Sequence, residues 1–127
     1  MKKILMSTVT VALIALMIAN VYAVSVPTPT FCEPYCSCGF TPGFWKHNIS
    51  VRLELTNGKY SAFKGAPQDG VKLTDDIMDD LLEAINTKYG TSLEFEDLLA
   101  NLKLKGWDPL RTNTANLFNE AAGYGPY

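Results

Sequence analysis

The chain has 127 residues, of which 47% are hydrophobic, and it carries 11 Lys and Arg against 13 Asp and Glu, a formal net charge of −2. This length fits one small domain plus an export segment and excludes two ordinary domains. Removal of Lys2 and Lys3 with that segment leaves nine basic and thirteen acidic residues, a net charge of −4. This balance argues against a nucleic-acid partner, because phosphate binding needs clustered basic charge.

The N-terminus has the pattern of a secretory signal peptide over residues 1–23. Two lysines precede an uncharged apolar run from Ile4 to Ala19, and Ala23 offers a small residue at the cleavage position. We expect cleavage to give a secreted, extracellular product that the cell surface retains only through its contacts. The alternative is an uncleaved anchor, because the apolar stretch extended to Val26 could span a bilayer of about 30 Å.

The segment after the predicted cleavage point cannot build a core by itself. Residues 24–31 alternate proline with small polar residues, which favours extended backbone and predicts a linker or a free N-terminal arm. A single domain then spans residues 32–127. Within it, Thr41 offers an N-cap hydroxyl and Pro42 suits the first helical position, so a short helix is predicted from Pro42 to about Ser50.

A small β-hairpin is predicted directly after this helix. Val51, Leu53 and Leu55 alternate with charged residues, and Asn57-Gly58 supplies residues that tolerate the positive φ angles of a tight turn. A loop rich in glycine and proline then spans residues 64–72. The returning strand of the hairpin would contain Tyr60 and Phe63.

An amphipathic helix is predicted between Thr74 and Gly90. Thr74 can cap it, Asp75 and Asp76 suit its first turn, and Gly90 suits its end. Apolar residues recur at spacings of three and four, as a helix with one buried face requires. These residues are Ile77, Met78, Leu81, Leu82, Ile85 and Tyr89.

Two more helices follow. Thr91 and Glu94 resemble a capping box for a helix that ends before Gly106, and Asp108-Pro109 starts the last helix, which ends before Gly123. The fold class is therefore mainly α with a small β-hairpin (α+β): three to four short helices in one compact domain after an N-terminal signal helix. The expected buried residues of these two helices are Phe95, Leu98, Leu99, Leu102, Leu110, Leu117, Phe118 and Ala121.

The cysteines and the one histidine allow two interpretations. Cys32, Cys36, Cys38 and His47 could supply four zinc ligands, although their spacing matches none of the common zinc patterns. Because exported proteins meet oxidising conditions, we expect instead a disulfide from Cys32 to Cys36 or Cys38, and no metal or other cofactor. One thiol is then left over, either inert or available to another subunit.

The sequence offers no complete catalytic constellation. His47 could pair only with a cysteine that stays reduced outside the cell, so we interpret it as structural. The acidic cluster over residues 75–83 is typical of a solvated helix face rather than a Ca²⁺ or glycosidase site. Asn48 begins an Asn-Ile-Ser glycosylation sequon, which matters only in a host with the machinery.

Aromatic residues offer the best case for a binding surface. One group lies before and within the first helix, whereas Trp107 and the Tyr124–Tyr127 tail lie at the other end of the domain. Exposed, they would stack on sugars or on a partner subunit; buried, they would supply the core. The tail, with its glycine and proline, suits an extended segment docked on a surface. The first group comprises Phe31, Tyr35, Phe40, Phe44 and Trp45.

The stretch from Gly39 to Asn48, which reads GFTPGFWKHN, resembles a motif of secreted prokaryotic proteins of unknown function, G-C-T-P-G-[YF]-W-K-N-H. Phe40 stands where that family often has Cys, and His47-Asn48 reverses the usual order. The resemblance implies an exported, surface-associated domain without an established enzymatic activity. A family pattern near the C-terminus, R-x-x-x-A-x-L-x-N-A-A, is similar to Arg111, Ala115, Leu117, Asn119, Ala121 and Ala122 here.

Three functions remain open. The first is a non-catalytic extracellular or cell-surface module, whose partner is a cell-envelope protein or a polysaccharide. The second is a self-associating subunit of a surface filament or layer that assembles through its N-terminal arm or C-terminal tail. The third is a metal-binding or hydrolytic secreted protein that uses the cysteines and the histidine. In the first, the structural hub or binding segment comprises Thr41, Pro42, Gly43, Phe44, Trp45, Lys46, His47 and Asn48.

Overall fold

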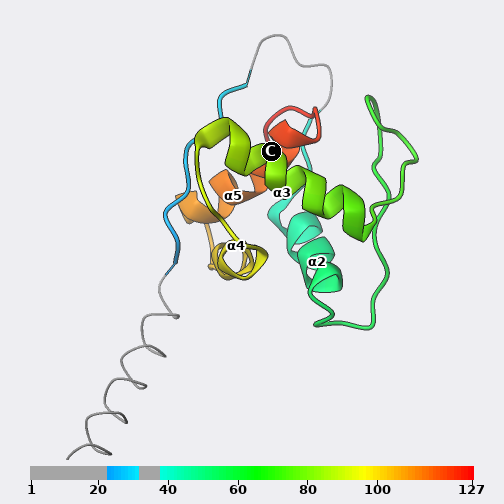
Figure 1. Cartoon of the computed structure of the whole chain (residues 1–127), viewed down its shortest axis with the longest axis horizontal. Helices are drawn as coiled ribbons and strands as arrows, with labels where there is room; N and C mark the ends of the chain where they lie inside the picture. The colour runs from blue at the N-terminus through cyan, green and yellow to red at the C-terminus, as the bar shows by residue number, and fades with distance from the viewer. Residues whose placement is uncertain (1–22, 32–37) are drawn as a thin grey trace, which may run out of the picture.

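A computed structural model describes residues 23–31 and 38–127 of the chain. The predicted signal peptide up to residue 22 lies outside these ranges, and so do Cys32 and Cys36. Figure 1 shows α5 at the centre of the fold, in contact with the other three helices. None of the helices in the described ranges is long and apolar enough to cross a membrane. The helices are α2 (Pro42–Arg52), α3 (Asp75–Tyr89), α4 (Phe95–Leu102) and α5 (Pro109–Ala121).

Three of the four helices begin at the caps that the sequence predicts. The Thr41 and Thr74 hydroxyls each accept a hydrogen bond from a backbone N–H three residues further on, and Asp108 accepts one from Leu110. Gly90 takes φ 64°, the left-handed conformation that ends α3 and that glycine adopts without strain. Local capping chemistry therefore determines where these three helices begin and where α3 ends.

Helix α4 starts without the predicted capping box. Its N-cap is Glu94, which makes no side-chain capping bond. The Thr91 hydroxyl instead donates to Asn86 Oδ1 (2.8 Å), and Asn86 also binds the backbone of Leu93, so this connection stays extended against α3. The capping box is thus a wrong prediction, because a tertiary partner takes the hydroxyl, whereas the buried face that begins at Phe95 is confirmed.

The predicted hairpin does not form, and the described residues contain no β-sheet. Helix α2 continues to Arg52, past the predicted end at Ser50, and the N–H of Leu53 still bonds to the Ile49 carbonyl. The φ angle of 58° at Glu54 then turns the chain away. Neither residue of the Asn57-Gly58 pair has a positive φ, so the tight turn that a hairpin needs is absent here.

The alternation of apolar and charged residues from Val51 to Leu55 misleads because its first residues belong to α2, which ends at Arg52 with Leu53 as its C-cap. Val51 and Leu53 are half-buried as the continuation of α2. The pairing that does form is a single antiparallel bridge between Ala62 and Lys72, across the loop predicted for residues 64–72. The mainly helical architecture is therefore correct, and the β component reduces to this one bridge.

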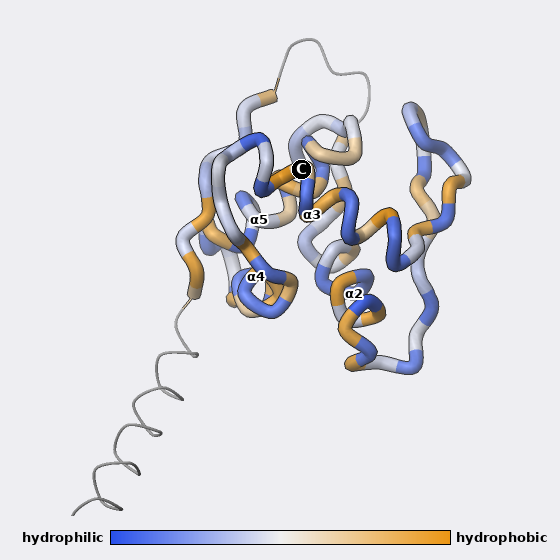
Figure 2. Tube along the Cα trace, in the orientation of Figure 1, coloured by the Kyte–Doolittle hydropathy of each residue, from blue (hydrophilic) through white to orange (hydrophobic). Residues whose placement is uncertain are grey.

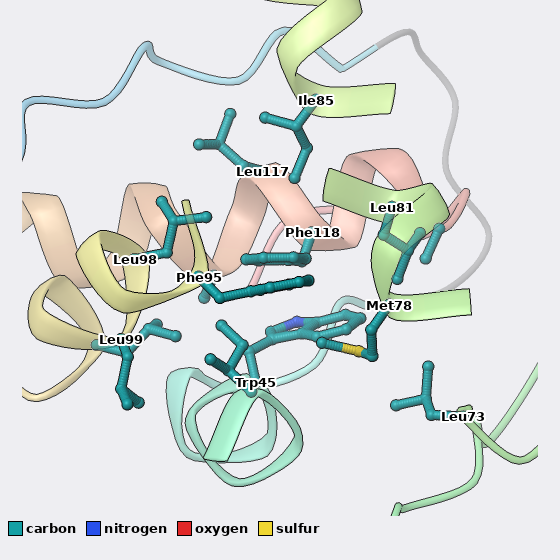
Figure 3. Packing of buried hydrophobic residues seen from close by; sticks show 14 of the residues in the cluster. Trp45, Leu73, Met78, Leu81, Ile85, Phe95, Leu98, Leu99, Leu117 and Phe118 are labelled. Atoms are coloured by element: carbon teal, nitrogen blue, oxygen red, sulfur yellow. The ribbon is translucent and has the colours of Figure 1, made fainter. Parts of the chain in front are cut away.

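The hydrophobic core lies where the four helices meet. Figure 2 shows apolar and polar segments alternating along α3, as expected of a helix with one buried face. In Figure 3, Trp45 of α2 lies among residues contributed by α3, α4 and α5, close to Phe118. The largest fully buried side chains are Trp45, Tyr124, Phe63, Phe118, Ile49, Leu73, Met78, Ile85, Leu98, Leu102, Leu117 and Asn48.

Both ends of the described chain fold back onto the helices. The N-terminal arm (residues 23–31) runs beside α4 and the end of α3 (Figure 1), where the Thr30 N–H donates to the Tyr89 hydroxyl (3.1 Å). The expectation of a linker or free arm thus changes to that of an arm docked on its own domain. The C-terminal tail (residues 123–127) is also docked, because Tyr124 is 0% exposed and its hydroxyl donates to the Gly65 carbonyl (2.8 Å).

Candidate functional site

The Thr41–Asn48 segment is divided between the core and the surface. Its apolar side chains turn inward with the asparagine, and its small and charged residues form the outer face of α2. Pro42, Trp45 and Asn48 are buried and Phe44 is half-buried, whereas Thr41, Gly43, Lys46 and His47 are exposed. The distinctive residues of the motif are therefore used mainly to hold α2 in the fold.

Asn119 of α5 joins this segment to the C-terminal helix. Its Oδ1 accepts hydrogen bonds from the Phe40 N–H (2.8 Å) and from Nε1 of Trp45 (2.9 Å). Its Nδ2 donates to the Phe40 carbonyl (3.0 Å) and to Asn116 Oδ1 (3.1 Å), which also accepts the N–H of Tyr127 (2.8 Å). We call these residues the Asn119 hub. Because Asn119 and Trp45 are 0% exposed, the hub satisfies polar atoms that water cannot reach.

Gly39 lets the chain approach the hub closely. Its N–H donates to the Pro126 carbonyl (3.2 Å). A Cβ at this position would lie 2.2 Å from the Gly125 carbonyl oxygen and 2.4 Å from Asn119 Nδ2, closer than real Cβ contacts allow. Gly43 of the same motif differs, since its nearest neighbour would be the Thr41 hydroxyl at 3.7 Å.

Of the first aromatic group, Phe40, Phe44 and Trp45 are packed together rather than presented to solvent, and Tyr35 lies outside the described residues. Trp45 stacks on Phe118 with ring centroids 5.1 Å apart, an arrangement visible in Figure 3. Phe40 stacks on Phe44 at 4.2 Å and meets the ring of Tyr124 edge-on at 4.8 Å. Such pairs add to the free energy of folding beyond the area that they bury. These rings are therefore part of the core, and an aromatic binding surface would have to use other residues.

Two further asparagines, the buried Asn101 and the half-buried Asn86, hold extended segments. Asn101 Oδ1 accepts from the Val24 N–H (3.1 Å) and its Nδ2 donates to the Val24 carbonyl (2.8 Å). Asn86 binds both the N–H (2.8 Å) and the carbonyl (3.0 Å) of Leu93 in the same way. Each amide pairs with both backbone groups of one residue, as Asn119 does in its hub. In the described residues, side-chain amides thus make the hydrogen bonds to extended backbone that a neighbouring strand would make in a sheet.

Asn48 is unsuited to glycosylation in the folded domain. Its side chain is 0% exposed, its Nδ2 donates to the Phe44 carbonyl (2.8 Å) and its Oδ1 accepts from the Ser61 N–H (2.9 Å). A glycan on Nδ2 would need space that the packed core does not offer. The amide instead ties α2 to the loop that follows it.

The proposed Cys and His array can be located only in part. Cys38 is exposed and free of any disulfide with described residues, and Cys32 and Cys36, the other disulfide candidates, lie outside them. His47 is exposed, and its Nε2 donates to the Lys59 carbonyl (2.8 Å), which ties the helix to the next loop. Within the described ranges, no three His, Cys, Asp or Glu residues gather as metal ligands would.

The acidic residues at the start of α3 mostly face solvent and engage neighbouring groups. Asp79 pairs with Arg52 of α2 through two hydrogen bonds of 2.8 and 3.1 Å, which raise the pKa of that guanidinium. Asp75 accepts a hydrogen bond from the Tyr60 hydroxyl. Burial first, and then this bond and the charge of Asp75, raise the pKa of Tyr60 above its ordinary range. These contacts account for the positions of the Asp75 and Asp79 carboxylates without a bound ligand.

Trp107 is the side chain that the fold leaves most clearly unexplained. It is 94% exposed, whereas Trp45 is fully buried. It follows Gly106, whose φ of 69° turns the chain between α4 and α5. The indole borders a surface pocket of about 390 Å³ that is also lined by Lys105, Arg111, Thr112 and Tyr127.

The charge of this pocket is opposite to that of the whole domain. Lys105 and Arg111 contribute two cations, and no acidic side chain belongs to the described residues that line the pocket. The guanidinium Nη1 of Arg111 lies 3.5 Å from the Gly106 carbonyl, so this side chain folds back toward the turn. Tyr127 adds a second aromatic side chain, 51% exposed. An aromatic platform beside two cations is suited to binding a ligand that is both flat and anionic.

Comparison of the chain with protein-family models, curated proteins and solved structures gives no match. The residues themselves therefore carry the functional argument. The sequence drew attention to Trp107 and to the tail as aromatic, but it marked Arg111 only as part of the C-terminal pattern and Lys105 not at all. These two cations line one pocket only through the turn between α4 and α5. Asn119 is part of the C-terminal pattern that resembles the secreted family, whereas nothing in the sequence marked Asn101.

Proposed function

We propose that this protein is an exported, non-catalytic interaction module whose contact surface is the pocket around Trp107. The observation that carries the proposal is the 94% exposure of this indole in a domain that buries its other tryptophan. A large aromatic side chain held in water by a glycine turn contributes little to folding, so binding is the better account of it.

The division of the Thr41–Asn48 segment supports the same function. The segment acts as a structural hub, since its tryptophan and asparagine are committed to internal hydrogen bonds and its histidine is bound to a backbone carbonyl. The polar side chains of the segment that were candidates for chemistry are thus engaged in holding the fold, which supports a binding function over a catalytic one. The apolar N-terminal run after two lysines supports export and an extracellular or cell-surface location.

Self-assembly into a filament or layer has less support. Donation of the arm or the tail to a neighbour would require each to leave its own domain, where Val24 and Tyr124 are held by hydrogen bonds. The metal-binding alternative depends on Cys32 and Cys36, which lie outside the described residues. Native mass spectrometry with and without reduction would separate both from a monomeric, metal-free product that begins at Val24.

The interaction function is tested by co-sedimentation of the purified protein with isolated envelopes of the cells that export it. We expect the wild type to sediment with the envelopes and Trp107→Ala to stay in solution. Leu55→Ala is the matched control, because Leu55 is a large apolar side chain, 63% exposed, outside the pocket. Equal sedimentation of wild type and Trp107→Ala would refute the proposed surface.

A further inference from the structure

We infer that the Trp107 pocket binds an anionic polysaccharide, with a sugar ring stacked on the indole and the carboxylate or sulfate group of that sugar held by Lys105 and Arg111. This inference rests on the proposed function and specifies the chemistry of the partner. It commits to a polysaccharide rather than to a protein or a nucleic acid, for reasons that the pocket itself supplies.

The platform for the sugar ring is the indole of Trp107. The apolar C–H face of a pyranose ring is flat and about as wide as an indole, so stacking removes apolar surface of both from water. The pocket of about 390 Å³ beside the indole is within the size range of small-ligand sites. Tyr127, half exposed on the same pocket, offers a second surface for an adjoining sugar.

The two cations of the pocket favour binding of an acidic sugar over a neutral one. The guanidinium of Arg111 can bind a carboxylate or sulfate through two parallel hydrogen bonds, and the ammonium of Lys105 adds a point charge. A neutral sugar would leave both cations without a counter-charge. On a chain with an overall excess of acidic residues, a pocket lined by two cations and by no acidic side chain attracts an anionic polymer.

The limited apolar area argues against a protein partner. Among the described residues, the large exposed hydrophobic side chains are Leu55, Val71, Trp107 and Tyr127, and only the last two line this pocket. A stable protein interface covers about 800 Å² on each partner and has an apolar centre, which two side chains do not provide. A nucleic acid would need cations along several successive phosphates, and the pocket has two.

The test is a binding titration of the purified full chain against four soluble polymers: polygalacturonate, which carries carboxylates, heparin, which also carries sulfates, neutral dextran and a single-stranded oligonucleotide. We expect binding to one or both acidic polysaccharides, weakened by added salt, and at least about tenfold weaker binding to dextran and to the oligonucleotide. Comparison of the two acidic polymers shows whether the pocket prefers the carboxylate or the sulfate.

Three variants separate stacking from charge. Trp107→Ala should weaken binding of the acidic polymer by at least about tenfold, and the Lys105→Gln, Arg111→Gln double variant should do so while also removing most of the salt dependence. Leu55→Ala should bind as the wild type does. Circular dichroism confirms that each variant is folded, which we expect because the changed side chains lie at the surface.

The remaining outcomes overturn the inference, and they do so separately from the proposed function. Binding of dextran or of the oligonucleotide as tight as that of the acidic polysaccharides, or no binding to any polymer, would contradict an anionic polysaccharide. Envelope sedimentation that depends on Trp107 but survives enzymatic removal of polysaccharide would assign a protein partner, leaving the proposed function in place. Envelope sedimentation that Trp107→Ala leaves unchanged would remove both.

Discussion

Replacement of Asn119 by alanine tests the claim that one buried amide joins three segments of the chain. The substitution removes the acceptor for the Phe40 N–H (2.8 Å) and for Trp45 Nε1 (2.9 Å), and the donor to the Phe40 carbonyl (3.0 Å) and to Asn116 Oδ1 (3.1 Å). Of these groups, Asn116 Oδ1 keeps another partner, the Tyr127 N–H. The main consequence is therefore two N–H donors left unpaired inside the protein.

The magnitude follows from these two donors. A buried donor without a partner destabilises a protein by about 1–3 kcal/mol, so the pair gives a loss of about 2–6 kcal/mol. Alanine is a better helix former than asparagine by about 0.5 kcal/mol, which offsets a small part of that loss. We expect the free energy of unfolding to fall by about 1.5–5.5 kcal/mol, a large share of the 5–15 kcal/mol typical of a domain.

Urea unfolding followed by far-ultraviolet circular dichroism measures this change. Asn113→Ala is the matched control, because Asn113 lies on the same helix, is half-exposed and makes no side-chain hydrogen bond within the described structure; its effect should stay within about 0.5 kcal/mol. A loss below about 1 kcal/mol for Asn119→Ala, or one equal to that of the control, would refute the reasoning. If Asn119→Ala does not fold, Asn116→Ala, which removes only two bonds, should unfold at intermediate urea.

Three further predictions rest on single contacts. Gly39→Ala should lower the melting temperature by several degrees because its Cβ meets the tail backbone, whereas Gly43→Ala should leave it within about 2 °C; equal shifts in a thermal melt would contradict the close approach. Tyr60 should ionise at higher pH than an ordinary tyrosine in an ultraviolet titration. Since its pKa is raised in the folded state, the stability that it contributes should be complete below about pH 10 and decline above it, and Asp75→Asn should reduce both effects. Asn101→Ala should release the N-terminal arm and speed its cleavage in limited proteolysis, and unchanged cleavage would show that the amide does not hold the arm.

Local signals in the sequence were sufficient for the starts of α2, α3 and α5 and insufficient for the contacts that join the helices. Thr74 and Gly90 delimit α3 correctly because a cap hydroxyl and a left-handed glycine act within a few residues. The hairpin prediction failed because Val51 to Leu55 fit a strand and a helix end equally, and packing against the core favoured the helix. The role of Asn101 could not be foreseen, since its partner Val24 is 77 residues away and nothing local distinguishes a bridging amide from a surface one.

The candidate site could not be predicted for the same reason, since it depends on contacts between residues far apart in the sequence. Exposure of Trp107 cannot be read from its neighbours in sequence, because a tryptophan in a small domain is more often part of the core. The turn at Gly106 and the return of α5 bring Arg111 and Tyr127 to the same pocket, and that juxtaposition is a property of the tertiary fold. The argument against a nucleic-acid partner, by contrast, used only the excess of acidic over basic residues. It remains a prediction, which the oligonucleotide titration tests.

The amide contacts also decide when the domain can acquire its structure during synthesis. The Asn119 hub joins Phe40 to a residue 79 positions later, and Asn101 holds a residue 77 positions earlier. A growing chain that has not yet reached α5 lacks the acceptor for Nε1 of Trp45 and the amide that binds Phe40 before α2. Because contacts of such wide sequence separation form late, we expect the core to be completed only after α5 has been synthesised. Late completion of the fold is compatible with the export that we propose, in which the chain would cross a membrane unfolded and fold on the far side.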